Sequence, residues 1–206
     1  MKRLLKIQIM ILALVMLVGC GKDNDVSQDS TEATEQAQVE ITESIPESDP
    51  SYWTTRGSDL AGYVQVPYNW TEDEYEYELE EHYSLMLISP DRNAMVSLIK
   101  NNYGFDTNIY DSQPPGEYIL EAYIAQYESQ GGQNMEVGTV NIAGYTFDRS
   151  VDCYPAGVYA DYDYYIYTYV TYTGDRFYTI VVEGDKATIE GIVTKVEESF
   201  SASEIK

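Results

Sequence analysis

Few residues in the sequence could carry out catalytic chemistry. The 206 residues include one histidine, His82, and two cysteines, Cys20 and Cys153. A serine hydrolase of the α/β class carries its nucleophile in a Gly-x-Ser-x-Gly pattern, and the sequence contains none. A catalytic cysteine needs a basic partner, for which only His82 is available. We therefore interpret His82 as an exposed residue without a catalytic role and Cys153 as a partly buried free thiol. Phosphate-binding loops and dinucleotide fingerprints are also absent, so we expect no cofactor.

Two acidic groups could bind a cation. The first group contains seven acids in one short segment, Glu72, Asp73, Glu74, Glu76, Glu78, Glu80 and Glu81. Carboxylate oxygens bind calcium when several of them converge on the ion. In an extended chain, alternate residues lie about 6.6 Å apart, which is too wide for neighbours to ligate one ion. We favour a solvated acidic face, with a calcium-responsive surface as the alternative, and interpret the second group, Asp161 and Asp163, in the same way.

Tyrosine is the most unusual feature of the composition. All 21 tyrosines lie from Tyr52 onward, and eight of them lie between Tyr159 and Tyr178. In a strand over 164–172, side-chain alternation places three of them on one face, Tyr165, Tyr167 and Tyr169. Such a face provides rigid, amphipathic area for protein or sugar contacts, and it also stabilises a sheet through cross-strand pairs. Structural stabilisation is the favoured interpretation, and a partner-binding surface on an open sheet face is the functional hypothesis.

Alternation and turn residues predict seven strands. The first covers 63–66 and stops at Pro67. Three predicted hairpins follow, at 84–99, 137–151 and 164–183, each with turn residues between its two apolar segments.

Two helices accompany these strands. Pro114-Pro115 begins the first, which has Ile119, Ala122, Tyr123 and Tyr127 on one face and ends at Gly131-Gly132. Asp185 is a suitable N-cap for the second, whose apolar face comprises Ile189, Ile192, Val193, Val196 and Phe200. Because hairpins pair antiparallel strands, the predicted class is α+β, a single domain with a mainly antiparallel sheet and helices packed on its faces.

The first twenty residues have the pattern of an export signal. Lys2, Arg3 and Lys6 precede an apolar run at 9–18, which is shorter than the roughly 20 residues of a membrane-spanning helix. The run ends in Leu17-Val18-Gly19-Cys20, which resembles the lipobox of bacterial lipoproteins. The resemblance implies cleavage before Cys20 and attachment of lipid to its thiol, and more than one acyl chain gives stable anchoring. The alternative is a plain secretory signal with an incidental cysteine.

The next segment has the composition of a disordered tether. Residues 21–50 contain no aromatic residue and many Asp, Glu, Ser, Thr and Gln residues, so they cannot bury enough apolar surface to fold. We therefore divide the chain into a signal peptide at 1–19, an acidic tether at 20–51 and a folded domain at 52–206.

Charge excludes one class of partner. The chain has 12 basic and 35 acidic residues and a net charge of −23. Proteins that bind DNA or RNA need clustered cations, so we expect no nucleic-acid partner. The predicted domain keeps 26 of the acids and eight of the cations. Its acidity should repel it from an anionic lipid surface.

Three short motifs resemble the PsbP-like lipoproteins of Gram-positive bacteria. They are Gly62-Tyr63-Val64-Gln65-Val66-Pro67 followed by Trp70, Val140-Asn141-Ile142-Ala143-Gly144-Tyr145, and Glu198-Ser199-Phe200. The resemblance spans about residues 60 to 201 and implies an antiparallel sheet with helices on its faces. It also implies a non-enzymatic binding or assembly role and transfers no catalytic residue, because the matching positions belong to turns, strands and the core.

Together these features predict a membrane-anchored, extracytoplasmic binding or assembly lipoprotein that is not an enzyme. Its expected partners are the membrane, through lipid on Cys20, and a protein or envelope component on the sheet face. The alternatives are a calcium-responsive domain and a hydrolase of envelope polymers. Such a hydrolase would need two carboxyl groups about 5 to 10 Å apart.

Overall fold

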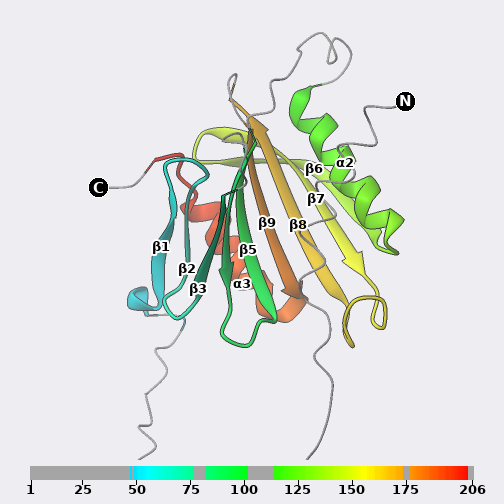
Figure 1. Cartoon of the computed structure of the whole chain (residues 1–206), viewed down its shortest axis with the longest axis horizontal. Helices are drawn as coiled ribbons and strands as arrows, with labels where there is room; N and C mark the ends of the chain where they lie inside the picture. The colour runs from blue at the N-terminus through cyan, green and yellow to red at the C-terminus, as the bar shows by residue number, and fades with distance from the viewer. Residues whose placement is uncertain (1–46, 48, 77–81, 102–113, 174–176, 204–206) are drawn as a thin grey trace, which may run out of the picture. The chain divides into compact units, whose positions relative to one another are not determined.

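The computed structural model of the chain describes residues 47, 49–76, 82–101, 114–173 and 177–203. These residues form nine strands, one short 3₁₀ helix and two α-helices (Figure 1). The strands are β1 (Trp53–Ser58), β2 (Gly62–Pro67), β3 (Thr71–Glu76), β4 (His82–Ile88), β5 (Ala94–Asn101), β6 (Gln133–Ile142), β7 (Tyr145–Tyr154), β8 (Tyr164–Tyr172) and β9 (Phe177–Asp185). The helices are η1 (Pro50–Tyr52), α2 (Pro115–Ser129) and α3 (Lys186–Ser199).

Seven of the strands form one antiparallel sheet in the order β3-β4-β5-β9-β8-β7-β6. β1 and β2 form a separate two-stranded sheet. The pairing of β5 with β9 joins the β4–β5 hairpin to the β8–β9 hairpin. The centre of the sheet is therefore held together by residues that are far apart in the sequence. The α+β class predicted from the sequence is confirmed.

The predicted hairpins form for local reasons that the sequence contains. Ala143 and Gly144 connect β6 to β7 and have φ angles of 51° and 85°. Two consecutive residues with positive φ make the type I′ turn, whose twist matches that of paired strands. Glycine adopts this conformation without steric cost.

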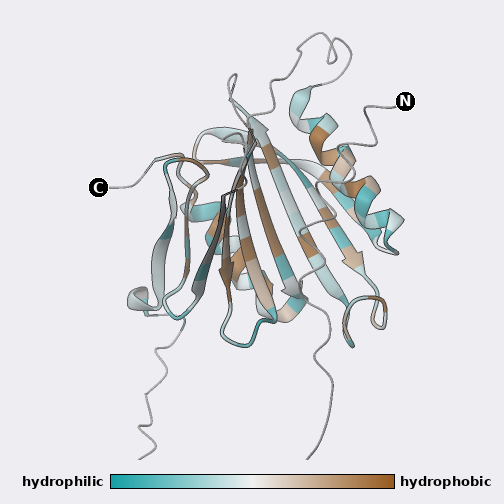
Figure 2. Ribbon diagram, viewed as in Figure 1, coloured by the Kyte–Doolittle hydropathy of each residue, from teal (hydrophilic) through white to brown (hydrophobic). Residues whose placement is uncertain are grey.

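Helix α3 covers one face of the sheet and contributes to the main core. Its N-cap, Asp185, accepts a hydrogen bond from the backbone N–H of Thr188 at 3.0 Å, as predicted. Ile189, Ile192 and Val196 are buried between β2 and the strands β8 and β9. The central strands β5 and β9 provide much of the apolar surface beneath them (Figure 2). The face predicted for this helix is confirmed.

Helix α2 lies on β6, β7 and β8 on the opposite face. Its buried residues are Gly116, Leu120 and Tyr127. The predicted face was partly wrong, because Leu120 is buried whereas Ile119 and Ala122 are only half-buried. Gly116 is buried on this face and lies directly against the side chain of Asp148 on β7, where a Cβ would contact the carboxylate.

The structure contains two strands that the pattern did not predict. β1 has an almost uniform intermediate exposure, so no alternation marks it in the sequence. β3 has the sequence Thr-Glu-Asp-Glu-Tyr-Glu, which has few apolar residues. Among the described strands β3 lies at the edge of the sheet and pairs on one side only, and an edge strand needs little apolar content.

Candidate functional site

The face of β8 that carries the three predicted tyrosines is the face that α3 covers. Tyr169 has 0% of its surface exposed. Its hydroxyl donates a hydrogen bond to Glu197 Oε1 of α3 at 2.8 Å. The hypothesis that this face is open to a partner is therefore wrong for Tyr169. Alternation correctly identified which side chains share a face, but it could not indicate which face a helix covers.

Tyr165 and Tyr167 lie on the same face and are half-buried against the main core. The ammonium nitrogen of Lys186, at the start of α3, is 5.2 Å from the centre of the Tyr165 ring, which is a cation–π distance. These contacts attach the N-terminal turn of α3 to the sheet. The structural interpretation of the tyrosine face therefore fits the geometry.

Six other tyrosines gather on the opposite face, and we call them the tyrosine cluster. Its members are Tyr123, Tyr127, Tyr154, Tyr159, Tyr162 and Tyr164. Their rings form a chain of contacts from α2 across the end of β7 to the 155–163 loop and the start of β8. The separations between consecutive ring centres are 6.2 Å for Tyr123–Tyr127, 6.3 Å for Tyr127–Tyr154, 5.7 Å for Tyr154–Tyr159, 4.8 Å for Tyr159–Tyr164 and 6.3 Å for Tyr162–Tyr164.

The cluster extends from the core to the surface. Tyr127 and Tyr154 are buried, with exposed fractions of 9% and 6%. Tyr162 and Tyr164 are half-buried. Tyr159 is 50% exposed, and its neighbour Val158 is 51% exposed. The buried rings therefore hold an exposed aromatic surface in place.

A carboxylate lies within this cluster. Glu183 of β9 accepts a hydrogen bond from the Tyr164 hydroxyl. Burial raises the pKa of Glu183 to about 7, because a desolvated carboxylate is disfavoured relative to its neutral form. Burial, together with the charge of Glu183, raises the pKa of Tyr154 to about 12. The site therefore combines aromatic surface with a carboxyl group that can change charge near neutral pH.

A second acid is buried near the edge of the cluster. Asp152 of β7 is 1% exposed. It accepts hydrogen bonds from Asn134 Nδ2 at 2.9 Å and from Ser150 Oγ at 2.7 Å. Burial raises the pKa of Asp152, and these two hydrogen bonds act in the opposite direction. The Asp152 carboxylate therefore has hydrogen-bond partners on both strands, and it links β6 to β7.

The acidic residues of the 155–163 loop do not form a cation site. Asp163 Oδ1 accepts a hydrogen bond from the backbone N–H of Ala156 at 2.9 Å and so closes the loop. Asp161 is exposed. Among the residues that the structure describes, no group of three or more His, Cys, Asp or Glu side chains could hold a metal ion. Most of the first acidic segment, the side chains from Asp73 to Glu81, lies outside the described residues.

The sulfur and imidazole groups have no catalytic arrangement in the described part of the chain. Cys153 is a free thiol with 7% of its surface exposed. Burial, together with the charge of Asp163, raises the pKa of this thiol, which makes it a weaker nucleophile at neutral pH. The side chain of His82 lies outside the described residues.

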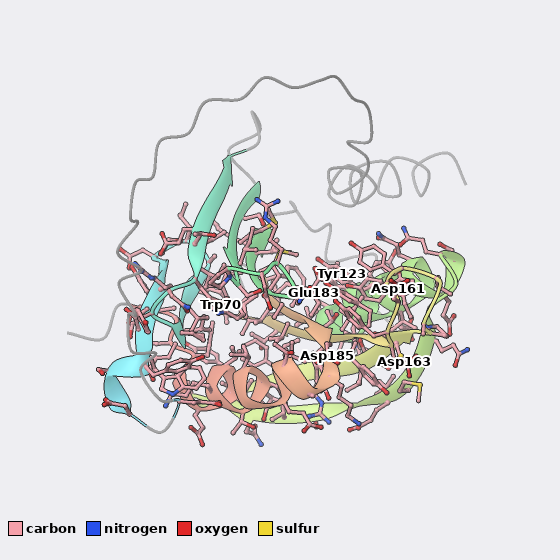
Figure 3. The ribbon with its side chains drawn as sticks, turned by 90° about the horizontal axis from the view of Figure 1, so that it is seen from below. Trp70, Tyr123, Asp161, Asp163, Glu183 and Asp185 are labelled. Atoms are coloured by element: carbon pink, nitrogen blue, oxygen red, sulfur yellow. The ribbon has the colours of Figure 1, made fainter. Side chains whose placement is uncertain are left out.

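A pocket of about 350 Å³ lies elsewhere in the domain. Trp70, Tyr52, Pro90 and Asp91 are among the residues that line it. Asp91 accepts hydrogen bonds from Ser89 Oγ at 2.7 Å and from the backbone N–H of Asn93 at 3.2 Å, so it closes its own turn. Figure 3 shows Trp70 well apart from Asp161 and Asp163. The pocket is therefore distinct from the tyrosine cluster and is the weaker candidate.

Sequence reasoning missed the cluster because its members come from three separate elements. Tyr123 and Tyr127 belong to α2, Tyr154 ends β7 and Tyr164 begins β8, while the adjoining Glu183 belongs to β9. One signal was present, since Glu183 directly follows the apolar run Ile180-Val181-Val182 within one strand. A charged residue in such a strand is a candidate for function.

Other predicted features lie outside the described residues. Cys20 and the proposed signal and tether are among them, apart from a few residues near residue 50. None of the helices that the structure describes is long and apolar enough to cross a membrane.

Comparison with known proteins gave matches in structure alone. No protein family model matches the sequence, and no curated protein matches it. The cyanobacterial PsbP (CyanoP) of Synechocystis sp. PCC 6803 matches with a TM-score of 0.53 and 11% identity, over 77% of this chain and 96% of that protein.

Two further solved structures match with lower scores. A protein from Bacteroides thetaiotaomicron has a TM-score of 0.43 and 14% identity, over 72% of this chain and 47% of that one. LpqN, involved in cell envelope biogenesis of Mycobacterium tuberculosis, has a TM-score of 0.35 and 13% identity, over 75% of this chain and 86% of LpqN. Of these three structures, cyanobacterial PsbP has the TM-score that supports the fold, and the chain has a PsbP-like fold.

Proposed function

We propose that the protein is a lipid-anchored, extracytoplasmic lipoprotein whose PsbP-like domain binds a protein or envelope component. The export pattern of the first twenty residues, with Cys20 at its end, supports the anchor. The acidic segment that follows supports a tether of on the order of 30 Å. The resemblance to PsbP-like lipoproteins supports a role in binding or assembly.

The exposed end of the tyrosine cluster is the binding surface in this proposal. The observation that carries it is that the half-exposed ring of Tyr159 packs against Tyr154 and Tyr164, beside Glu183. Tyrosine loses little conformational entropy on binding, and these rings are already held by their neighbours. An aromatic surface next to a carboxylate suits a partner that presents basic side chains, through cation–π and ionic contacts.

We also propose that the domain is not an enzyme. The free thiol has a raised pKa, and Asp152 is engaged in hydrogen bonds with its neighbours. Glu183 is half-buried and bonded to a tyrosine hydroxyl. A binding role uses the arrangement of the cluster as it is, whereas paired-carboxylate hydrolysis would need a second carboxyl group placed across a substrate.

The test is partner capture by the full chain in intact cells. Chemical cross-linking followed by purification should recover a partner with the unmodified chain, and Tyr159→Ser should lower the yield at least tenfold, as expected for a central interface aromatic. The matched control is Tyr68→Ser, which removes a tyrosine that is 38% exposed and lies outside the cluster. Equal yields from the two variants would contradict the assigned surface.

The anchor is tested separately. Cys20→Ser should move the protein from the membrane fraction to the soluble fraction, because it removes the thiol to which the lipid attaches. Mass spectrometry of the unmodified protein should show an N-terminus at Cys20 with added acyl mass. A processed N-terminus without that mass would instead support the plain secretory signal.

A further inference from the structure

The two edges of the seven-stranded sheet differ in how they prevent pairing with another strand. Both edge strands, β3 and β6, have a neighbour on one side only among the described strands. β3 has four acids in six residues, Glu72, Asp73, Glu74 and Glu76. Charged residues of this kind block edge-to-edge association. The edge formed by β6 carries a single acid, Glu136, and one bulge near its N-terminal end.

β6 has the properties of a pairing edge. It is ten residues long, and its exposed residues include Met135 and Val137, each 58% exposed. A bulge between Asn134 and Glu136 leaves Met135 without a partner on β7. Large apolar side chains that are this exposed on a long edge strand indicate an interaction surface.

The single charge of β6 is already compensated. Glu136 forms an ion pair with Arg149 on the neighbouring strand β7. Arg149 also lies 3.5 Å from Glu197 of α3, so its position is fixed by the main fold. β6 therefore presents an edge with almost no net charge in a strongly acidic domain.

We propose that β6 pairs with β6 of a second copy of this chain, antiparallel and centred on Gly138. In this register no acid faces an acid. The opposed pairs are Met135 with Asn141, Glu136 with Val140 and Val137 with Thr139. Gly138 meets its own copy at the two-fold axis, and a Cβ built at Gly138 has no atom within 4 Å. The register is self-complementary, as a two-fold interface requires.

The charge pattern of β6 itself does not suit a basic partner strand. A basic strand would need acids on the edge, and the one acid of β6 is paired within its own domain. The remaining charge of the chain is negative. Two copies therefore repel each other at long range, and salt weakens this repulsion because the Debye length falls from about 14 Å at 50 mM to about 4 Å at 500 mM salt. Salt should strengthen self-pairing, whereas it would weaken the binding of a basic partner.

The inference does not depend on the proposed function. The pairing edge consists of β6 residues, whereas the tyrosine cluster consists of residues of α2, β7, β8 and the 155–163 loop. A variant of one surface can therefore be used as a control for the other.

The experiment is disulfide cross-linking of the full chain, purified in detergent. Gly138→Cys places a thiol at the two-fold axis, where directly opposed Cα atoms lie about 4.5 to 5.5 Å apart, within the range for a disulfide. Thr139→Cys is the register control, because the two copies of residue 139 would be diagonal neighbours about 7 to 8 Å apart, which is too far for a disulfide. Thr71→Cys is the control for the acidic edge β3.

We expect the Gly138→Cys dimer to form at least ten times faster than the dimer of either control. Raising NaCl from about 50 to 500 mM should increase the rate of dimer formation, because salt screens the repulsion between the two acidic chains. Val137→Asp, added to Gly138→Cys, should reduce the rate at least tenfold because it places two new acids at the interface. Val137 is exposed, so the variant should fold, and circular dichroism checks this.

Three results would overturn the proposal. One is equal cross-linking of Gly138→Cys and Thr71→Cys. Another is a product whose mass is not that of two copies of the chain. The last is a rate that falls with added salt. The unmodified chain measures the background from Cys20 and Cys153, and Tyr159→Ser should leave the Gly138→Cys rate unchanged.

Discussion

The two faces of the seven-stranded sheet are built from different side chains. The face under α3 is apolar, with buried residues that include Leu85, Leu87, Val96, Leu98, Phe147, Ile180 and Val182. The face under α2 has five buried hydroxyl side chains and one buried acid between its apolar residues, Ser84, Ser97, Ser150, Asp152, Thr168 and Thr179. Strand alternation separates the two sets, since each strand contributes to both faces.

The proposed function assigns different roles to the two faces. Burial of large apolar side chains supplies most of the free energy of folding, so the α3 face can stabilise the domain. The α2 face gains less from burial, and it holds the tyrosine cluster and Glu183. Functional groups are often placed at a cost in stability that the rest of the fold offsets. Substitutions on the α3 face should therefore change stability most, and substitutions in the tyrosine cluster should change partner binding most.

The largest expected effect comes from the α3 face. Phe200 is 3% exposed and makes edge-to-face contacts with Phe147 and Tyr178, with ring centres 5.3 Å and 5.8 Å apart. Phe200→Ala should lower the free energy of unfolding by about 3 to 5 kcal/mol, as for other buried aromatics. Thr168→Val on the α2 face is the control and should change it by about 1 kcal/mol or less. Urea unfolding measures both variants, and similar losses of free energy of unfolding in Phe200→Ala and Thr168→Val would contradict the division between the faces.

An effect of intermediate size on the free energy of unfolding is expected from Glu183, and its size depends on pH. The folded pKa is about 7, above the ordinary value of 4.5. The folded state therefore keeps a proton that the unfolded state has lost, so stability falls as the pH rises from 4.5 to 7. Glu183→Gln removes this dependence and can still accept the Tyr164 hydrogen bond. At about pH 8 it should be more stable than the unmodified protein by about 1 to 3 kcal/mol.

The control for this prediction is Glu190→Gln, which changes an exposed glutamate of α3. Urea unfolding at about pH 5 and about pH 8 measures both variants. Glu183→Gln should show its gain only at the higher pH. An equal gain at both pH values would mean that the effect comes from packing and not from ionisation.

The sequence predicted the fold well because most of its elements are encoded locally. The hairpin at Ala143-Gly144 depends on two residues with positive φ, and α3 depends on Asp185 and an apolar stripe. Such features depend on neighbours a few residues away. Strand β1 was missed because it is stabilised by pairing with β2 and has no pattern of its own.

The candidate site could not be predicted in the same way. Its residues come together only through pairing of β7 with β8 and β8 with β9, and through the position of α2 on the sheet. Tyr165 and Tyr164 are adjacent in sequence, yet Tyr165 packs toward α3 and Tyr164 belongs to the cluster. Composition identified tyrosine as important, and only the tertiary structure shows which tyrosines are exposed.

The smallest expected effect on the free energy of unfolding comes from removing single tyrosine hydroxyl groups, at Tyr169 and at Tyr159. Tyr169→Phe removes the buried hydrogen bond to Glu197 and keeps the ion pair of that carboxylate with Arg149. It should lower the free energy of unfolding by about 1 to 2 kcal/mol. Tyr159→Phe, on the exposed end of the cluster, should lower it by less than about 0.5 kcal/mol. Capture of a partner should respond in the opposite order, since only Tyr159 can reach one. A loss of capture in Tyr169→Phe at unchanged stability would reverse the roles of the two faces.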